Sequence, residues 1–192
     1  MARSKEFDPE RVLLKAMSLF WRLGYENTSV EALMREMGVA RQSLYDTFGD
    51  KRALYLKALA FYRDRTNGDM QRMLESTPSV KAAFTKLLYG LAAETREQHE
   101  RGCLLLSANL QRDPKDVAVA NFLRDNQARV EALFDSALRR AQKEGELSAK
   151  VDTTALARFL VVTIQGMRAI ARLQPDRKAL EQVAHIALAV FG

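Results

Sequence analysis

The sequence has little of what disulfide-linked, membrane-spanning or β-rich proteins need. It contains one cysteine, Cys103, which excludes an intramolecular disulfide. It has no run of about 18 consecutive apolar residues and no apolar N-terminal segment of the kind that directs secretion. With 4 prolines and 9 glycines it has few breaks, and no segment alternates apolar and polar residues with β-branched side chains. We therefore predict an all-α, cytoplasmic protein with no membrane partner.

Groups that carry out catalysis or hold metal ions are also scarce. The two histidines, His99 and His185, fall in different predicted helices, and neither has cysteine or acidic residues at the spacing of metal ligands. No glycine-rich phosphate loop is present. A nucleophilic mechanism would rest on Cys103 without an identified base. We expect no enzymatic activity, no metal and no cofactor.

The charge balance permits a polyanionic partner but does not identify one. The 30 Lys and Arg residues exceed the 24 Asp and Glu residues, which gives a net charge of +6. Hydrophobic residues make up 47% of the chain, which is sufficient for a buried core. A modest positive charge is ordinary in proteins, so it supports nucleic-acid binding only together with a motif.

Residues 28–51 have the pattern of two short helices joined by a tight turn. Thr28 and Glu31 form a capping box, which predicts that the first helix starts there. Gly38 ends this helix, because glycine accepts the left-handed conformation that a sharp turn needs. A second short helix follows, and the pair has the pattern of a helix-turn-helix.

The second helix of this pair begins with polar side chains. Arg41, Gln42 and Ser43 are expected to face outward. Arginine can read guanine, and glutamine can read adenine, in the major groove of DNA. A merely solvated helix face is the alternative interpretation, but the position of these residues directly after a glycine turn favours DNA contact.

The residues that follow resemble a known family. The run from Ser43 to Leu54, Ser-Leu-Tyr-Asp-Thr-Phe-Gly-Asp-Lys-Arg-Ala-Leu, is similar to the DNA-binding domain of the TetR family of transcriptional regulators. Members share a Leu-Tyr-x-x-Phe run, a short polar turn and a lysine that opens the next helix. The similarity covers about residues 7–62. Met34 stands where the family usually has alanine, and its flexible side chain can still pack there.

The resemblance implies a division of the chain and a function. Residues 1–52 would form the helix-turn-helix domain, with a connecting helix from about residue 51, and residues 53–192 a regulatory domain that binds a ligand and dimerises. The protein would be a ligand-responsive regulator, most often a repressor in this family. It would bind a palindromic operator of double-stranded DNA as a homodimer and respond to a small-molecule effector. The alternative is a helical small-molecule carrier that does not bind DNA.

The predicted DNA-contacting residues lie near helix starts. Thr28 and Ser29 offer hydroxyl and backbone N–H groups that can hold a phosphate. Tyr45 occupies a family position that usually reaches a phosphate, and a phosphate would relieve Lys51, whose charge opposes the helix dipole. The arm Met1 to Phe7, with basic side chains, is expected to fray or to touch DNA. The full set is Thr28, Ser29, Arg41, Gln42, Ser43, Tyr45 and Lys51.

Caps, prolines and glycines divide the chain into about nine helices, three in the first domain and six in the second. The later ones are predicted over about residues 51–76, 78–100, 103–113, 114–144, 152–173 and from 177 onward.

A small-molecule pocket among the middle helices is implied by the resemblance. For each residue below, filling an ordinary core is the alternative interpretation, because Met and Phe stripes are more often core than pocket. The candidate lining residues are Met70, Met73, Phe84, Leu88, Cys103, Leu106, Phe122, Phe134 and Gln165.

Cys103 has a second possible role. It follows Arg101 and Gly102 and stands near a predicted helix start, and both a nearby cation and a helix N-terminus favour a reactive thiolate. Some members of the family sense oxidants or electrophiles through a cysteine. A lone cysteine before three leucines is otherwise a small buried apolar residue.

The last two helices carry more apolar surface than one core needs, which predicts a dimer interface. A two-fold dimer would bury the same face on both copies in a four-helix bundle. The candidate interface residues are Val161, Ile164, Leu180, Val183, Ala184, Ala187, Leu188 and Phe191.

Overall fold

The computed structural model describes residues 7–191, and within this range the chain is helical with no strand, which confirms the all-α prediction. The N-terminal arm, with Arg3 and Lys5, falls almost entirely outside the described residues. The helices are α1 (Pro9–Leu23), α2 (Val30–Met37), α3 (Arg41–Phe48), α4 (Lys51–Ser76), α5 (Val80–Ala92), α6 (Arg96–Arg101), α7 (Leu104–Gln111), α8 (Val117–Lys143), α9 (Thr153–Leu173) and α10 (Arg177–Leu188), followed by the short 3-10 helix η1 (Ala189–Phe191).

Two helix boundaries differ from those predicted. The helix expected over residues 78–100 is two helices, because Thr95 and Gln98 form a capping box that starts α6. The Gln98 Oε1 accepts from the Thr95 N–H at 2.7 Å, and the Thr95 Oγ1 accepts from the Gln98 N–H at 3.3 Å. The helix expected from Pro114 begins at Val117, where the Asp116 side chain caps it.

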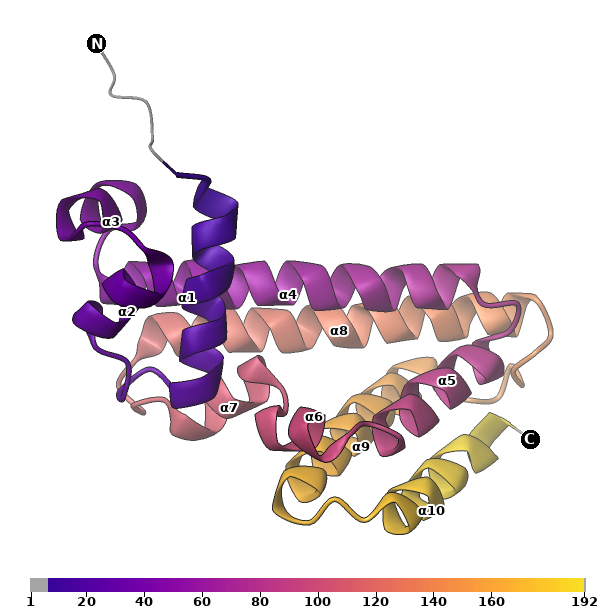
Figure 1. Cartoon of the computed structure of the whole chain (residues 1–192). Helices are drawn as coiled ribbons and strands as arrows, with labels where there is room; N and C mark the ends of the chain where they lie inside the picture. Colours follow the sequence, from indigo (N-terminus) through magenta and orange to yellow (C-terminus); the bar gives the residue numbers. More distant parts are fainter. Residues whose placement is uncertain (1–6, 192) are drawn as a thin grey trace.

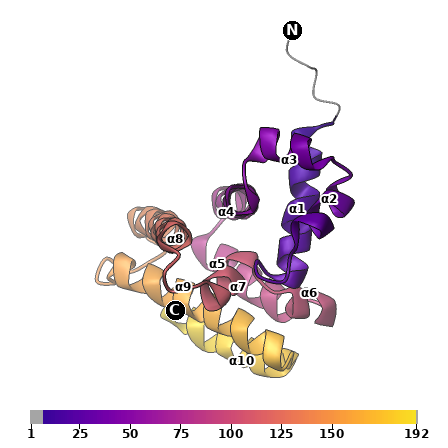
Figure 2. The same cartoon turned by 90° about the vertical axis from the view of Figure 1, so that its left-hand side faces the viewer.

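The helices form two connected groups (Figures 1 and 2). At one end α1 packs against α2 and α4, and α3 lies beside the start of α4. At the other end α5, α9 and α10 pack together, and α8 packs against α9. The long helices α4 and α8 run side by side between the two ends.

Buried apolar side chains form one cluster at each end. The N-terminal cluster is centred on Phe20, Leu33 and Leu44, but it also includes Leu104 of α7 and Val119 of α8. Helices from the second half of the chain therefore pack into the core of the helix-turn-helix. The division at residue 52 stays a prediction.

The larger cluster is centred on two phenylalanines. Phe84 of α5 and Phe134 of α8 are both fully buried, and their rings meet edge to face with centroids 5.0 Å apart. The ring of Phe191 stacks on Phe84 at 5.7 Å. This packing joins α5, α8 and the C-terminal turn into one core.

Helix α4 connects the two ends without interruption. Its start is tied to α8 by an ion pair between Arg52 and Asp116, and this arginine holds the pKa of the Asp116 carboxyl below its usual value. Near its end, the Arg140 guanidinium donates to the Leu74 carbonyl at 2.7 Å. Because α4 is held at both ends, a shift at one end can reach the other.

Candidate DNA-binding surface and effector cavity

The turn between α2 and α3 has the geometry that the sequence predicts. Gly38 adopts the left-handed conformation with φ +73°, and its N–H bonds to the Met34 carbonyl at 2.9 Å. A β-carbon would find open space at Gly38, so the conformation rather than crowding requires glycine. The helix α3 then starts at Arg41 with no side-chain cap on its first N–H groups.

The first two residues of α3 lie at the surface and make only weak contacts within the protein. Arg41 pairs with Glu31 of α2, and Gln42 donates to Asp46 at 2.8 Å. All four side chains are in exposed positions. Exposed ion pairs contribute about 0–1 kcal/mol, so Arg41 can exchange Glu31 for a DNA partner at small cost. Ser43 beside them is half-buried.

The cap of α2 differs from the predicted one. Ser29, not Thr28, is the N-cap, and its Oγ accepts from the Ala32 N–H at 3.0 Å. Thr28 is fully buried, and its hydroxyl donates to the Gly24 carbonyl at 2.6 Å. The expected phosphate contact through the Thr28 hydroxyl therefore does not fit this structure, because the group is turned inward and already bonded. Ser29 remains exposed at the helix start.

Tyr45 and Lys51 lie close to the same surface. Tyr45 is 37% exposed, so it can reach a partner outside the protein. The Lys51 Nζ lies 4.2 Å from the centroid of the Tyr25 ring. Such a cation–π contact is weak at an exposed site, at about 0.5–1 kcal/mol, and holds the lysine near the start of α4.

Two supporting residues were not found from the sequence. The Lys57 ammonium donates to the carbonyls of Thr47 and Phe48, at 3.3 and 3.2 Å, at the C-terminal end of α3. There it compensates the negative end of the α3 dipole and fixes α3 against α4. Tyr25 positions Lys51. Neither role has a signal in the sequence, because each depends on a contact between helices.

A cavity of about 520 Å³ lies between α4, α7, α8 and α9, with Leu87 of α5 at its wall. This volume lies within the usual range for small-molecule sites, about 300–1,000 Å³. Its lining changes along α8 from Arg124, which is exposed, to Phe134, which is fully buried. The cavity therefore has a polar end and an apolar end.

The middle of this cavity contains paired amide side chains. Asn67 of α4 donates to Asn126 of α8 at 3.0 Å, and Gln165 of α9 donates to Gln127 of α8 at 2.8 Å. Thr66 and Asn67 lie within a continuous α4 and line this cavity.

The structure places some of the predicted pocket residues at the cavity and others in the core. Met70, Cys103, Leu106, Phe134 and Gln165 line it. Met73, Phe84, Leu88 and Phe122 do not; Phe84 and Leu88 are fully buried core residues, and the Phe122 ring packs under the Arg63 guanidinium at 4.9 Å. The missed polar lining residues are Tyr62, Thr66, Asn67, Asn109, Arg112, Arg124, Asn126, Gln127 and Arg168.

Cys103 is half-buried at the N-cap of α7 and lines the cavity. It contacts the Tyr62 hydroxyl, and burial raises the pKa of that hydroxyl above its ordinary value, so Tyr62 stays neutral. The guanidinium of Arg101 stacks on the Trp21 ring at 4.5 Å. That Cys103 senses oxidants or electrophiles stays a prediction.

One hydrogen bond connects the helix-turn-helix to the polar end of the cavity. The Trp21 indole of α1 donates to the Arg101 carbonyl at 2.9 Å, at the end of α6. The Trp21 ring also meets the Tyr62 ring edge to face, with centroids 4.8 Å apart. Because Tyr62 lines the cavity, its ring connects Trp21 of α1 with the cavity wall.

The apolar face left uncovered by α9 and α10 is not the predicted one. Val161 and Ile164 line the cavity, and Leu180, Ala184, Ala187, Leu188 and Phe191 are buried within the core. These residues face inward because α10 packs against α5 as well as α9. Of the predicted set, Val183 is exposed. The exposed apolar residues of α9, α10 and η1 are Phe159, Val162, Ile170, Leu173, Val183, Ile186 and Val190, which we call the outer apolar face.

Among the described residues, α9 is the one helix that is long and apolar enough to cross a membrane, judged by length and composition alone. Of its most apolar 18-residue segment, 33% is buried. The core helix of a globular protein passes the same test, and α9 packs against α5, α6, α8 and α10. Its remaining apolar residues belong to the outer apolar face. In the part of the chain that the structure describes, no three His, Cys, Asp or Glu side chains are grouped to hold a metal ion.

An exposed α3 after a glycine turn, joined through α4 to a region with its own cavity, defines a DNA-binding regulator with a separate regulatory region. Residues 12–58 match the family model of bacterial regulatory proteins of the tetR family, and residues 80–187 match the tetracyclin repressor-like C-terminal domain. The chain belongs to the TetR family of transcriptional regulators and is a DNA-binding regulator of transcription.

Relatives and solved structures agree over the whole chain. An uncharacterized HTH-type transcriptional regulator of Bacillus subtilis, YezE, is 34% identical over 193 residues and is matched over 100% of both chains. The HTH-type transcriptional repressor ComR of Escherichia coli is 32% identical, over 98% of this chain and 91% of the relative. A cysteine mutant of the TetR family regulator CifR, complexed with 26-bp operator DNA, is 31% identical with a TM-score of 0.87, over 99% of this chain and 100% of the other.

Proposed function

We propose that this protein is a ligand-responsive repressor that binds a near-palindromic operator as a homodimer and leaves it when an effector fills the cavity between α4, α7, α8 and α9. The observation that carries the proposal is that α4 belongs to both sites. It begins beside the DNA-facing α3, with Lys51, and lines the cavity with Tyr62 and Met70. The repressor named among the relatives and the operator complex of CifR support the sign of regulation and the partner.

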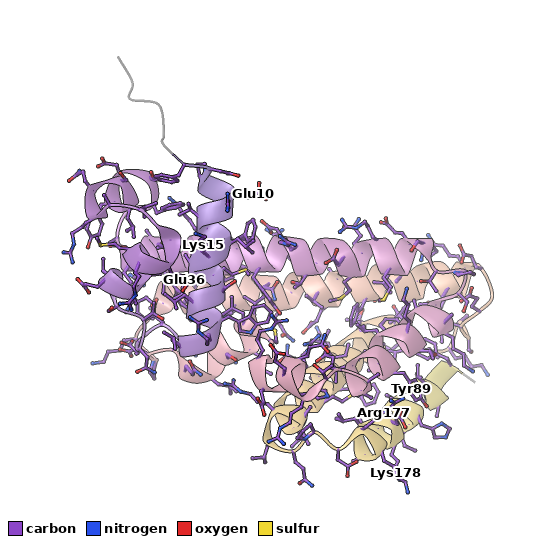
Figure 3. The ribbon with its side chains drawn as sticks, viewed as in Figure 1. Glu10, Lys15, Glu36, Tyr89, Arg177 and Lys178 are labelled. Carbon is purple, nitrogen blue, oxygen red and sulfur yellow. The ribbon has the colours of Figure 1, made fainter. Side chains whose placement is uncertain are left out.

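In this proposal two copies of α3 enter successive major grooves. Arg41 and Gln42 read base edges, while Ser29, Ser43, Tyr45 and Lys51 hold phosphates. Phosphate contacts set the position of the helix, and base contacts select the sequence. The basic residues Arg177 and Lys178 take no part, because they lie on α10, at the far end of the molecule from α1 and its Glu10 and Lys15 (Figure 3).

The two copies associate through the outer apolar face. On α9, Phe159, Val162, Ile170 and Leu173 follow one another at intervals of three, eight and three residues, which places them on one helical stripe that is free for a partner. Gly166 lies within this stripe at an exposed position, with nothing within 4 Å of where a β-carbon would be, so a partner helix can approach closely there. Association of the same stripes about a two-fold axis gives a four-helix bundle and the symmetry that a palindrome requires.

Release follows from two arrangements of the dimer with different spacing of the α3 helices. An effector that fits the cavity better in the non-binding arrangement shifts the population toward it. Binding to chromosomal DNA places this function in the cytoplasm, and the protein carries it out by binding alone, without catalysis.

The DNA-binding part of the proposal is tested by two substitutions with different expected results. Arg41→Ala reduces discrimination between operator and random DNA by roughly 1–3 kcal/mol, because a bidentate contact to one base is lost. Lys51→Ala weakens binding to both DNAs alike and flattens the dependence of log K on log salt by about one unit. Fluorescence anisotropy with a promoter fragment and a scrambled duplex, over a series of salt concentrations, measures both effects.

Arg72→Ala is the matched control, because Arg72 is an exposed arginine of α4 whose partner is its neighbour Asp69. It leaves affinity and salt slope unchanged. If Arg41→Ala weakens binding to operator and to random DNA equally, Arg41 does not read bases. If the wild-type protein prefers no promoter sequence over random DNA, the proposed function is wrong.

The connection through Trp21 gives a prediction about effector response. Trp21→Phe removes the indole donor to the Arg101 carbonyl but keeps an aromatic ring against Tyr62. The loss of one hydrogen bond lowers the free energy of unfolding by about 1 kcal/mol. We expect the variant to bind the operator but to release it less completely with compounds that stabilise the wild type in a thermal-shift screen. Complete release from the variant would show that the Trp21 contact does not transmit the signal.

A further inference from the structure

The polar end of the cavity is cationic and contains no acidic side chain. Three of the residues that line it are arginines: Arg112 at the end of α7, Arg124 on α8 and Arg168 on α9. Among the described residues, no aspartate or glutamate lines it. Arginines brought together without a carboxylate repel one another, and this arrangement is stabilised when an anion binds between them.

These arginines differ in how far they are already engaged. Arg168 has an ion pair with Glu94, whose oxygen lies 3.8 Å away, outside the cavity lining. Arg124 donates to the neutral Asn121 side chain at 2.9 Å. The Nη1 of Arg112 donates to the Asp113 carbonyl at 3.5 Å, whereas its Nε is buried and has no hydrogen-bond partner among the described residues. A buried donor without a partner costs about 1–3 kcal/mol, more when the group is charged, and this donor belongs to one of the arginines that line the cavity.

The opposite end of the cavity is apolar. Phe134 is fully buried and Val161 is 3% exposed, and Met70 and Leu87 complete that wall. Arg124 and Phe134 are ten positions apart on α8, which corresponds to about 15 Å along the helix. The amide pairs in between are bonded to each other, so they offer few free groups to a ligand.

We infer that the effector of this regulator is an amphipathic organic anion, with its charged head at Arg112 and Arg124 and its apolar body against Phe134 and Val161. The inference rests on the proposed function, because it names the class of ligand for the same cavity. Arg168, which already has a carboxylate partner, adds positive charge at the head end. A cationic ligand is repelled there, and a neutral ligand leaves the positive charge of the arginines uncompensated.

The position of the head connects this chemistry to the DNA-binding end. Arg168 and Cys103 share the polar end of the cavity with Tyr62, whose ring contacts Trp21 of α1. An anion bound there alters the charge next to the junction of α6 and α7, where the Arg101 carbonyl accepts the Trp21 hydrogen bond. In this inference the apolar body of the ligand contributes most of the binding affinity, and its charged head causes the change that reaches the DNA-binding end.

The test compares ligands of one chain length with different heads, on the full-length protein. Isothermal titration measures binding of decanoate, decyl phosphate, decanamide and decylamine, and anisotropy measures operator release. We expect the anions to bind at least about tenfold more tightly than the amide, because charge-assisted hydrogen bonds are the stronger kind. We expect no binding of the amine. Preference for decanoate or decyl phosphate identifies the head as carboxylate or phosphate.

Two variants and one control locate the head. Arg112→Gln and Arg124→Gln each weaken anion binding by about tenfold or more and leave amide binding unchanged. Arg129→Gln removes an exposed arginine of α8 that does not line the cavity, and anion binding is unchanged in it. Arg124 is exposed, so its substitution keeps the test informative if Arg112→Gln does not fold.

Equal or tighter binding of decanamide or decylamine, no binding of either anion, or unchanged anion affinity in Arg124→Gln would each overturn the inference. Operator binding by the ligand-free wild type is measured in the same experiment. If that fails, the proposed function is wrong; if it succeeds while the anions fail, the error lies in the ligand class.

Discussion

Ile186→Arg is expected to convert the dimer into a monomer and to abolish specific operator binding. Ile186 is 69% exposed at the centre of the α10 part of the outer apolar face, between Val183 and Val190. In the proposed dimer each copy would bury an unpaired guanidinium. Leaving a charge buried without a partner costs about 3–5 kcal/mol, so dimerisation weakens by at least about a hundredfold. Sedimentation velocity at micromolar concentration measures the change.

The matched control is Leu110→Arg. Leu110 is a branched aliphatic side chain that is also highly exposed, at 70%, but it lies on α7 and is not part of the outer apolar face. This variant stays dimeric and binds the operator. An Ile186→Arg protein that remains dimeric, or a wild-type monomer at micromolar concentration, would contradict the proposed interface. Leu188→Arg, which the sequence pattern suggests for this purpose, is unsuitable because Leu188 is 8% exposed within the core and its substitution would disturb folding.

Phe84→Ala is expected to lower the free energy of unfolding by about 3–5 kcal/mol, the usual cost of truncating a buried phenylalanine. Phe84 is fully buried between Phe134 and Phe191 and contributes nothing to the cavity wall. Urea denaturation at a fixed protein concentration measures the loss, since the stability of a dimer depends on concentration.

Leu110→Ala serves as the comparison, because truncation of this exposed side chain changes stability by less than about 0.5 kcal/mol. A Phe84→Ala protein with nearly wild-type stability but altered ligand binding would contradict the core position of Phe84 and support the sequence-based prediction that it lines the pocket.

The fold class and the helix-turn-helix were predictable because their signals are local. Gly38 marks the turn by a backbone conformation that glycine adopts without strain, and the neighbouring helix periodicity places Leu44 and Phe48 inside. The exposed Arg41 and Gln42 follow from the same periodicity. The sequence predicted Thr28 as the N-cap of α2, and the structure has Ser29. Local signals cannot separate these two adjacent hydroxyl residues, because only tertiary packing buries Thr28.

The sequence indicates that α9 and α10 are apolar on more than one side, but it does not show which side is left exposed for a partner. Helical periodicity defines a stripe such as Leu180, Ala184 and Leu188, and that stripe is equally suited to the core and to a second copy. The position of α5 decides between them, because α10 packs against α5 with these residues buried. Val183 and Ile186 are left outside for the same reason.

The cavity likewise belongs to the tertiary structure. Its lining comes from five helices, and Arg112, Arg124 and Arg168 come from the end of α7, from α8 and from α9. Individually each is an ordinary polar residue of an amphipathic helix, and only the packing of α4, α7, α8 and α9 brings them to one end of a common space. The helical fold class and the build of the DNA-binding end are predictable from the sequence, because those features depend on neighbours within one or two turns. Which apolar residues stay exposed on α9 and α10, and the charge of the cavity, depend on which helix packs against which, so only the folded chain shows them.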